Sequence, residues 1–260
     1  MSSNERDGHG AQTQAIVRAA AALKLAAVHP GQGIGVTELA RALDVSKPTA
    51  HRILRSLSHE KLLEQRPGSR RYQPGALLFE LGLAACAQFN LGQSCLPILE
   101  QLASESGDTS FLFVRSGNDA ICVQRAIGHA ARQTPVLPVG SRQPLGVSAG
   151  GLALLAFLPA DEQDEVLEKI AERIEAYGEL KAAAVRRFIH QAREHGYAWI
   201  HNHAVPGTGA IGLPIMDSRG NIIAALTVAC TWTRMDPAHI GEILPMLQHA
   251  VRQTGSLLRQ

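Results

Sequence analysis

The 260-residue chain is poor in aromatic side chains, and it has no long apolar run. Phe, Trp and Tyr together make up 4% of it, so its cores must be built mainly from Leu, Ala, Ile and Val. No apolar stretch reaches the length of a membrane span, and the N-terminal MSSNERDGHG lacks the apolar core of a signal peptide. We therefore expect a cytoplasmic protein with no membrane partner.

Cysteines are few and carry no recognisable pattern. Cys86, Cys95, Cys122 and Cys230 show neither CxxC spacing nor a paired framework. Such cysteines are typical of reduced thiols in a cytosolic protein, so we expect no disulfide and no structural zinc. Cys122 and Cys230 stand in apolar strand patterns, where cysteine usually serves as a small buried hydrophobe.

Motifs of enzymes and cofactor sites are also missing. The chain contains no G-x-S-x-G elbow, P-loop, HExxH or GxGxxG, which leaves Ser148 without catalytic context. His201 and His203 would face one side of a strand, within reach of one metal ion, but no third ligand follows at a recognisable spacing. The sequence therefore predicts no catalytic residue, no cofactor and no metal site, and it favours polar histidines at a pocket mouth.

The most informative segment is residues 36–72, VTELARALDVSKPTAHRILRSLSHEKLLEQRPGSRRY. A short helix is predicted from Thr37, its expected N-cap, to Leu43. A break at Asp44 and Val45 follows, and a second helix is predicted after an N-cap at Ser46. A helix, a turn and a basic helix in this order are typical of a helix-turn-helix that places its second helix in the DNA major groove.

The second helix is amphipathic. Its apolar positions share one face, which leaves polar and basic residues on the other. We expect that face to contact DNA through Ser46, Lys47, Thr49, His51, Arg52 and Arg55. The alternative is an ordinary solvated helix face, which carries similar residues.

A basic hairpin follows the second helix. Residues 62–66 and 70–73 are predicted to form two strands around Pro67-Gly68-Ser69. Arg66, Arg70 and Arg71 cluster near the turn, where their mutual repulsion favours a polyanionic partner. An edge hairpin kept soluble by charge is the alternative. The preceding helix pair favours a DNA-binding wing.

Charge is divided unevenly along the chain. Residues 1–74 hold 11 Lys and Arg against 6 Asp and Glu, while residues 75–260 hold 14 against 17. A basic front joined to a mildly acidic remainder suits a DNA-binding domain attached to a domain with another task. We predict a disordered lead over 1–12, a winged helix-turn-helix over 13–74, a linker helix over 75–90 and a second domain over 91–260.

The first helix is predicted over residues 13–28, with Ile16, Ala19, Ala20, Leu23 and Ala27 as its buried stripe. In the second domain, hairpin signals at residues 110–126 and 209–229 are separated by helical patterns and by a Pro- and Gly-bearing stretch over residues 134–146. Strands in hairpin sets with helices between them predict an α+β fold with a mostly antiparallel sheet.

Several segments together resemble the IclR family of bacterial transcriptional regulators. They are ELARALDVSKPTAHRILRSL, the hairpin ending in RRY, QPGALLFELG, SRQPLGVSAGGLALLAF and GLPIMDSRGNIIAALTVA. The resemblance covers roughly residues 13–257. It implies a GAF-like effector-binding domain behind the DNA-binding head, and a homodimer, often a dimer of dimers, on a palindromic operator.

The resemblance also implies an effector pocket between a six-stranded sheet and the helix that begins near Ser148. The positions carried over are Ala149, Gly150, Ile200, Thr208, Ala210, Thr227 and Ala229. This chain departs from the commoner polar pattern at Gly146, Leu152, Ile200, Ala210 and Ala229, and each departure removes a hydrogen-bonding side chain. We therefore expect an effector larger and less polar than a small keto acid, such as an aromatic acid or a lactone.

The sequence thus predicts a DNA-binding regulator of a catabolic operon, gated by a small effector. The alternative is an enzyme or signalling module whose basic head only tethers it to nucleic acid. Residues 91–260 show no nucleophile–base pair and no set of metal ligands at recognisable spacing, which favours the regulator.

Overall fold

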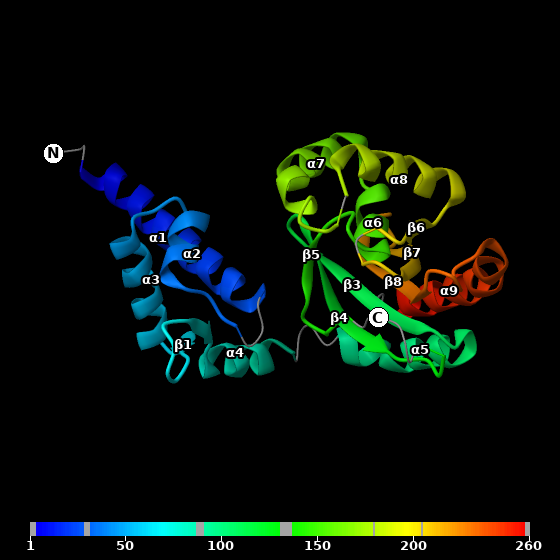
Figure 1. Ribbon diagram of the computed structural model, residues 1–260, viewed down its shortest axis with the longest axis horizontal. Coiled ribbons are helices and arrows are strands. Elements are labelled where there is room, and N and C mark those ends of the chain that lie inside the picture. The colour runs from blue at the N-terminus through cyan, green and yellow to red at the C-terminus, as the bar shows by residue number, and fades with distance from the viewer. Residues whose placement is uncertain are drawn as a thin grey trace. The chain divides into compact units, whose positions relative to one another are not determined.

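A computed structural model describes residues 4–28, 32–86, 91–130, 137–178, 180–203 and 205–257, with the side chains of residues 4–13, 28 and 86 outside the description. The chain forms two compact units, residues 1–89 and 90–260 (Figure 1). Each unit has its own hydrophobic core. The predicted α+β class, with a helix-turn-helix head and an antiparallel second domain, is confirmed.

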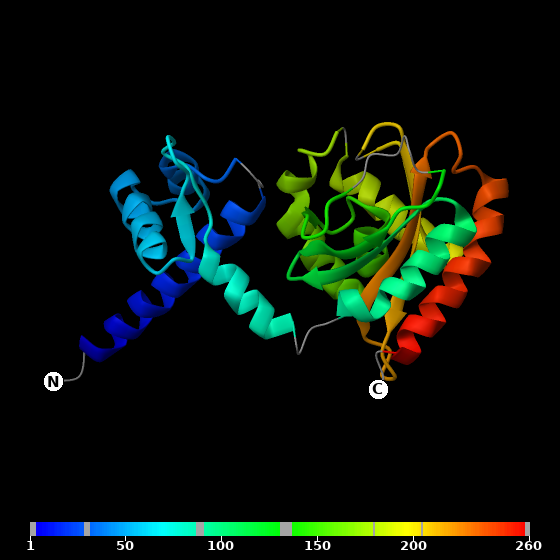
Figure 2. The same cartoon turned by 90° about the horizontal axis from the view of Figure 1, so that it is seen from below.

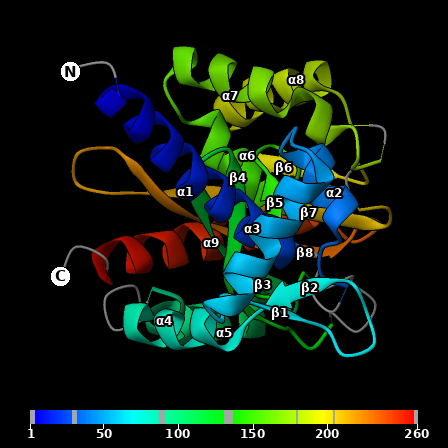
Figure 3. The ribbon, with the colours of Figure 1, turned by 90° about the vertical axis from the view of Figure 1, so that its left-hand side faces the viewer.

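The head unit consists of helices packed on a small hairpin. Its elements are α1 (Asn4–Val28), α2 (Val36–Ala42), α3 (Lys47–His59), β1 (Leu63–Gln65), β2 (Tyr72–Pro74) and α4 (Ala76–Cys86). β1 and β2 pair in antiparallel register, and Ile34 bridges to Tyr72. Figure 3 shows this hairpin in cyan below α2 and α3. The core joins α1, α2 and α3 to the hairpin through Ala26, Leu39, Leu54 and Leu63, which are fully or almost fully buried.

Local sequence signals set the turn between α2 and α3. Asp44 adopts φ 49°, a left-handed conformation in the turn that follows α2. Ser46 caps α3 by accepting a hydrogen bond from the Thr49 backbone N–H, and Pro48 stands in the first turn, as predicted. The expected cap of α2 at Thr37 is wrong. Gly35 precedes that helix, and its N–H donates to the Glu38 carboxylate at 3.1 Å.

The first helix differs from its prediction at both its start and its buried face. α1 begins at Asn4, within the stretch expected to be disordered. Among its described side chains, Ala22 and Ala26 are fully buried, whereas Ile16 is 72% exposed. The predicted stripe was chosen by apolar character alone. The observed contact surface centres on small alanines, with Ala19, Leu23 and Leu25 packed partly against it, while Ile16 in the middle of the helix stays outside the core.

The second unit is built on one six-stranded sheet in the order β5-β4-β3-β8-β7-β6, with every neighbouring pair antiparallel. Its strands are β3 (Thr109–Ser116), β4 (Asp119–Ala126), β5 (Arg142–Pro144), β6 (Ala198–His201), β7 (Thr208–Met216) and β8 (Ile222–Thr231). Its helices are α5 (Leu91–Ser106), α6 (Ala149–Ala156), α7 (Ala160–Ile174), α8 (Ala182–His195) and α9 (Pro237–Leu257).

The sheet separates two helical layers. α6, α7 and α8 cover one face, and α5 and α9 lie side by side on the other (Figures 1 and 2). Alternate strand residues face opposite layers, so each layer has its own core. Val228 and Cys230 of β8 belong to the core under α5 and α9, while Ala225 belongs to the core under α6.

The structure differs from the prediction in the Pro- and Gly-bearing stretch and at the end of the linker helix. The Pro- and Gly-bearing stretch contains a short strand, β5, which three residues were too few to reveal by alternation. The linker helix was predicted to reach Asn90. α4 ends at Cys86, and residues 87–90 lie outside the described residues. Within the part of the chain that is described, no helix is long and apolar enough to cross a membrane.

Candidate nucleic-acid interface and ligand cavity

The outward face of α3 carries most of the residues predicted to contact DNA. Ala50, Leu54 and Leu57 hold the opposite face in the core of the head. This leaves Ser46, Lys47, His51, Arg52 and Arg55 exposed. Thr49 is half-buried, and its hydroxyl lies 2.9 Å from the Ser46 hydroxyl. Thr49 therefore belongs to the cap at the start of the helix as well as to its polar face.

The hairpin brings further basic side chains next to this helix. An open groove on the head is bordered by His51 and Arg55 of α3 and by Gln65 and Arg70 of the hairpin. A shallower depression beside it joins Arg52 to His51 and Arg55. Arg66 and Arg70 are both exposed at the turn, which is closed by a hydrogen bond from the Arg66 N–H to the Arg71 carbonyl at 3.0 Å. The two depressions share His51 and Arg55, so helix and hairpin hold their basic side chains close together, with Glu38 and Glu60 also in the linings.

Arg71, which was predicted to contact DNA, makes several bonds within the head. Its guanidinium forms a bidentate pair with the Glu38 carboxylate, at 3.0 and 2.8 Å. It also donates to the carbonyls of Gln32 and Gly33, each at 2.8 Å. These bonds tie the hairpin to the loop that leads into α2. The planar fork of arginine suits this use, and it turns the charge of Arg71 toward the head.

The second unit contains a cavity of about 210 Å³ between the sheet and the start of α6. It lies against β3, β7, β8 and the last residues of β6. All of the effector positions implied by the family resemblance meet in its wall, namely Ala149, Gly150, Ile200, Thr208, Ala210, Thr227 and Ala229. Phe111, Phe113, Leu137, Pro138, Gln143, Val147, Ser148 and Val205 complete the lining. Segments far apart in the sequence therefore converge on one small space.

The wall of the cavity is mostly apolar. No Asp, Glu, Lys, Arg or His stands among the described residues that line it. Gln143 is 9% exposed, and its buried Oε1 has no hydrogen-bond partner among the described residues. The Thr208 hydroxyl already donates to the Val205 carbonyl at 2.6 Å. A ligand would therefore meet apolar surface, a few hydroxyls and one amide in need of a partner.

Glycine at position 150 lets the start of α6 approach the sheet. A Cβ on Gly150 would lie 2.2 Å from the ring of Phe113, a distance that no real contact allows. Ser148 caps the helix by accepting from the Gly151 N–H at 3.1 Å. The first N–H groups of a helix lack intrahelical partners. Ala149 and Gly150 thus bring such groups to the cavity wall.

Two of the departures from the family pattern lie outside the cavity. Leu152 is fully buried in the core under α6, and it is not among the lining residues. Gly146 adopts φ +84°, and a Cβ there would lie 2.6 Å from the Val185 side chain. Neither position therefore removes a polar group from the cavity, contrary to the expectation. Ile200, Ala210 and Ala229 are the departures that do face it.

The cysteine and histidine side chains considered for catalysis or metal binding in the sequence lie either in the hydrophobic core or against aromatic rings. Burial raises the pKa of the Cys122 thiol to about 11. The His201 ring lies between those of Trp199 and Trp232, at 5.8 and 5.4 Å, and the His203 ring lies 5.0 Å from that of Phe188. Among the described residues, the one group with metal-ligand spacing is Asp108, Cys230 and His239. Sequence reasoning missed it because its members are far apart along the chain.

Comparisons with known proteins agree with this geometry. The family model of the IclR helix-turn-helix domain matches residues 15–67, and that of the bacterial transcriptional regulator IclR C-terminal domain matches residues 83–255. The glycerol operon regulatory protein of Streptomyces griseus is 32% identical over 225 residues, 86% of this chain and 87% of that protein.

Solved structures share the fold. An IclR transcriptional regulator from Alicyclobacillus acidocaldarius superposes with a TM-score of 0.74 at 25% identity, over 94% of this chain and 98% of the other. An IclR homologue from Microbacterium hydrocarbonoxydans, solved with 4-hydroxybenzoate, gives 0.67 at 23% identity, over 95% and 98%.

Proposed function

The chain belongs to the IclR family of bacterial transcriptional regulators, and on that premise we propose that its head binds operator DNA under the control of a small effector in the cavity. The observation that carries this proposal is the pairing of two sites in one chain. One is the basic surface of α3 and the hairpin, and the other is the apolar cavity behind α6. We propose a catabolic operon as the target, as for the glycerol operon regulator that the chain resembles.

On the head, we assign the contacts by position. Lys47 and Arg52 are exposed in the first two turns of α3, where side chains reach base edges most easily. Ser46, His51 and Arg55 extend the same face, and Thr49 supports it through the cap. Arg66 and Arg70 of the hairpin lie at its turn, where they would meet phosphates. Arg71 would act indirectly, by holding the hairpin against α2.

For the effector, we propose an aromatic acid or a lactone. A cavity of about 150 Å³ is enough to bind benzene, so about 210 Å³ can hold one substituted ring. A two- or three-carbon keto acid would leave much of the apolar wall without contacts. A ring hydroxyl or similar donor would satisfy the Gln143 Oε1, and the N–H groups at the start of α6 would favour a carboxylate.

We further propose that the protein acts as a homodimer or a dimer of dimers. Ile16 and Val17 of α1 and Phe79, Leu81 and Leu83 of α4 are between 52% and 72% exposed. Large apolar side chains gathered on two helices of one unit indicate an interaction surface. A second copy of the head, covering this surface, would also supply the paired reading heads that a palindromic operator requires.

A regulator is favoured over an enzyme by the lining of the cavity, whose described residues include no titratable side chain that could act as acid, base or nucleophile.

Isothermal titration calorimetry of the full chain tests the ligand class. We expect 4-hydroxybenzoate or a related ring acid to bind, and glyoxylate and pyruvate to bind far more weakly. Gln143→Leu keeps the size of that side chain but removes its amide, and it should weaken a hydroxylated ring more than the parent benzoate. Tight binding of glyoxylate or pyruvate alone would overturn the assignment.

A further inference from the structure

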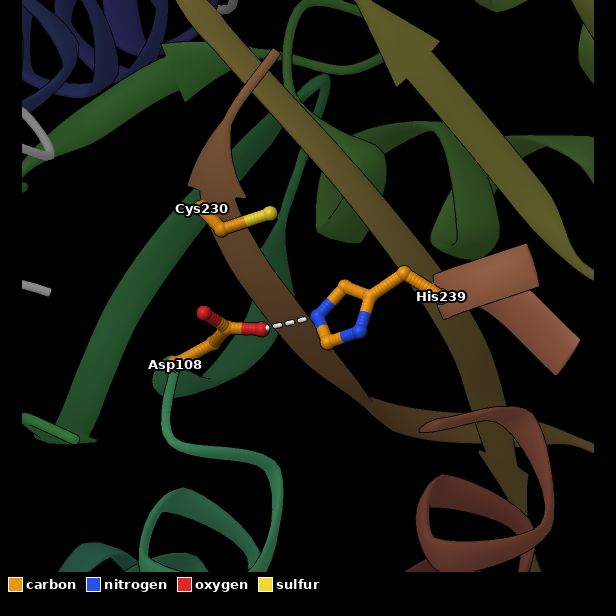
Figure 4. Close-up of side chains that lie close together, drawn as sticks. All are labelled: Asp108, Cys230 and His239. Atoms are coloured by element: carbon orange, nitrogen blue, oxygen red, sulfur yellow. Dashed lines mark hydrogen bonds and ion pairs between the residues drawn. The ribbon is translucent and has the colours of Figure 1, made fainter. Parts of the chain in front are cut away.

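Three side chains from separate elements meet beneath α5 and α9. Asp108 lies in the turn between α5 and β3, Cys230 lies near the end of β8, and His239 lies in the first turn of α9. The register that pairs Thr109 with Ala229 places Asp108 next to Cys230. One potential ligand atom from each of the three lies within 4.8 Å of the others (Figure 4).

The group is buried and bears charge. Asp108 is completely buried, Cys230 is 1% exposed, and the His239 side chain is 13% exposed. The Arg234 Nε lies 3.0 Å from Asp108 Oδ1, while Oδ2 lies 2.6 Å from His239 Nε2 (Figure 4). A buried carboxylate needs such partners to offset its lost hydration. Arg234 forms an ion pair with Oδ1, which has no hydrogen-bond partner among the described residues, and Oδ2 faces the imidazole.

A second carboxylate orients the imidazole. His239 Nδ1 lies 3.3 Å from Glu242 Oε2, one turn along α9. Histidines that bind metals almost always donate their second ring N–H to a carboxylate, a carbonyl or water, which fixes the tautomer and directs the other nitrogen at the ion. With Nδ1–H donated to Glu242, the Nε2 lone pair would point at Asp108 and Cys230.

We propose that Asp108, Cys230 and His239 bind a divalent metal ion of the zinc type. A thiolate, an imidazole and a carboxylate form a ligand set that zinc accepts in tetrahedral geometry, and three protein ligands leave one position for water. One thiolate and one carboxylate neutralise the double charge of the ion. On binding, the Cys230 thiol proton and the proton shared by His239 Nε2 and Asp108 Oδ2 are both released to solvent, and the metal replaces the hydrogen bond between His239 and Asp108.

This metal site is distinct from the effector cavity. Ala229 lines the cavity, but the next residue, Cys230, points to the opposite face of the sheet. A bound ion would fasten the beginning of α9 to the end of β8 and to the turn before β3. It would therefore stabilise the layer of α5 and α9 without touching the effector.

Cobalt titration of the full chain tests the proposal. A Cys86→Ser background, treated with a chelator and dialysed, removes the thiol whose surroundings are not described. We expect one Co²⁺ per chain, with a thiolate-to-cobalt charge-transfer band in the near ultraviolet and competition by Zn²⁺. Cys230→Ala and His239→Gln should each abolish the band. Glu242→Gln should weaken binding by roughly 10- to 100-fold.

Cys122→Ser is the matched control, because Cys122 is equally buried but lies in the core under α6. It should keep the band and the stoichiometry. Surface histidines can bind Co²⁺ but cannot give a thiolate band. The proposal is overturned if folded wild-type protein shows no such band at saturating Co²⁺, or if the band persists in Cys230→Ala. In either case Asp108, His239 and Arg234 are a structural tether, and the thiol beside them is incidental.

Discussion

Single arginines on the head divide between two tasks. Arg52 and Arg70 are exposed on α3 and on the hairpin, whereas Arg71 is held by Glu38 and by two loop carbonyls. In our proposal arginine thus serves as a ligand for DNA at some positions, whereas at position 71 it acts as a structural clamp within the head. Substitution by alanine should separate these tasks.

Arg52→Ala is expected to weaken binding to the preferred operator by about 1–3 kcal/mol and to relax specificity at one base position. Arg70→Ala should weaken binding to all sequences alike and lower the salt slope by about 1, since a phosphate contact carries no sequence information. Gel shifts on operator and scrambled DNA at several salt concentrations measure both. An equal loss on the two DNAs for Arg52→Ala would contradict a base contact.

Arg71→Ala should instead lower the stability of the head. Exposed ion pairs contribute up to about 1 kcal/mol, and the two carbonyl bonds add to this. Thermal unfolding followed by circular dichroism should show an earlier transition for Arg71→Ala than for Arg70→Ala, which serves as its matched control. Identical transitions, with a loss of DNA binding in both, would mean that Arg71 is a DNA contact after all.

Buried thiols give a prediction about pH. Burial raises the pKa of Cys95 and Cys122 to about 11 and that of Cys230 to about 12, and nearby Asp108 adds to the rise at Cys230. The folded state therefore favours the neutral thiols. The stability that this contributes is complete below the ordinary pKa of about 9 and is lost as the pH rises through 11 to 12.

In the Cys86→Ser background with a chelator present, iodoacetamide should thus react slowly with the folded chain at pH 8 and quickly once the chain is unfolded. Equal rates in the two states at pH 8 would show that the thiols are accessible and ionised, contrary to the structure.

Residues whose partners are close in sequence were predictable. Ser46 and Thr49 are three positions apart, so the cap of α3 could be predicted from the pattern alone. Arg71 binds Glu38 across 33 positions, and His239 meets Asp108 across 131, so only the folded chain brings these pairs together. The cavity positions came from resemblance to a family, because no local pattern marks Ala210 or Ala229 as neighbours.

Among the helices and strands, the contact between the start of α6 and the sheet is the one that shapes the cavity. The helix can begin against Phe113 because residue 150 is glycine, and that approach leaves the cavity between the helix start, β7 and β8. Helices and long strands followed from periodicity and turn signals. The three-residue β5 did not, and of the predicted buried stripe of α1 only Ala19 and Leu23 pack against the core, because the contact centres on Ala22 and Ala26.

Filling this cavity with a larger side chain should weaken effector binding without changing DNA binding by the free protein. Ala229→Phe places a ring in the space, and we expect more than a tenfold loss of effector affinity with operator binding by the free protein unchanged. Ala183→Phe on the exposed side of α8 is the control, since it makes the same change away from the cavity. Unaltered effector affinity in folded Ala229→Phe would contradict this location for the ligand site.

For the molecule as a whole, the proposed control by an effector would have to pass between two units with separate cores. A ligand shifts operator affinity only by its differential affinity for the arrangements that the heads can adopt. In our proposal α4, which joins the head to the second unit, conveys this difference, and its exposed Phe79, Leu81 and Leu83 lie against a second copy. The charge of the chain follows the same division, with a basic head and a mildly acidic remainder.

Footprinting on the DNA upstream of the chain's own gene and its neighbours tests whether the head recognises one DNA sequence. We expect a defined, two-fold symmetric protected site that survives moderate salt and excess nonspecific DNA, and that disappears with Arg52→Ala. Protection spread evenly along the DNA, equal for scrambled sequence and abolished by modest salt, would contradict it. In that case the basic head would be only an electrostatic tether.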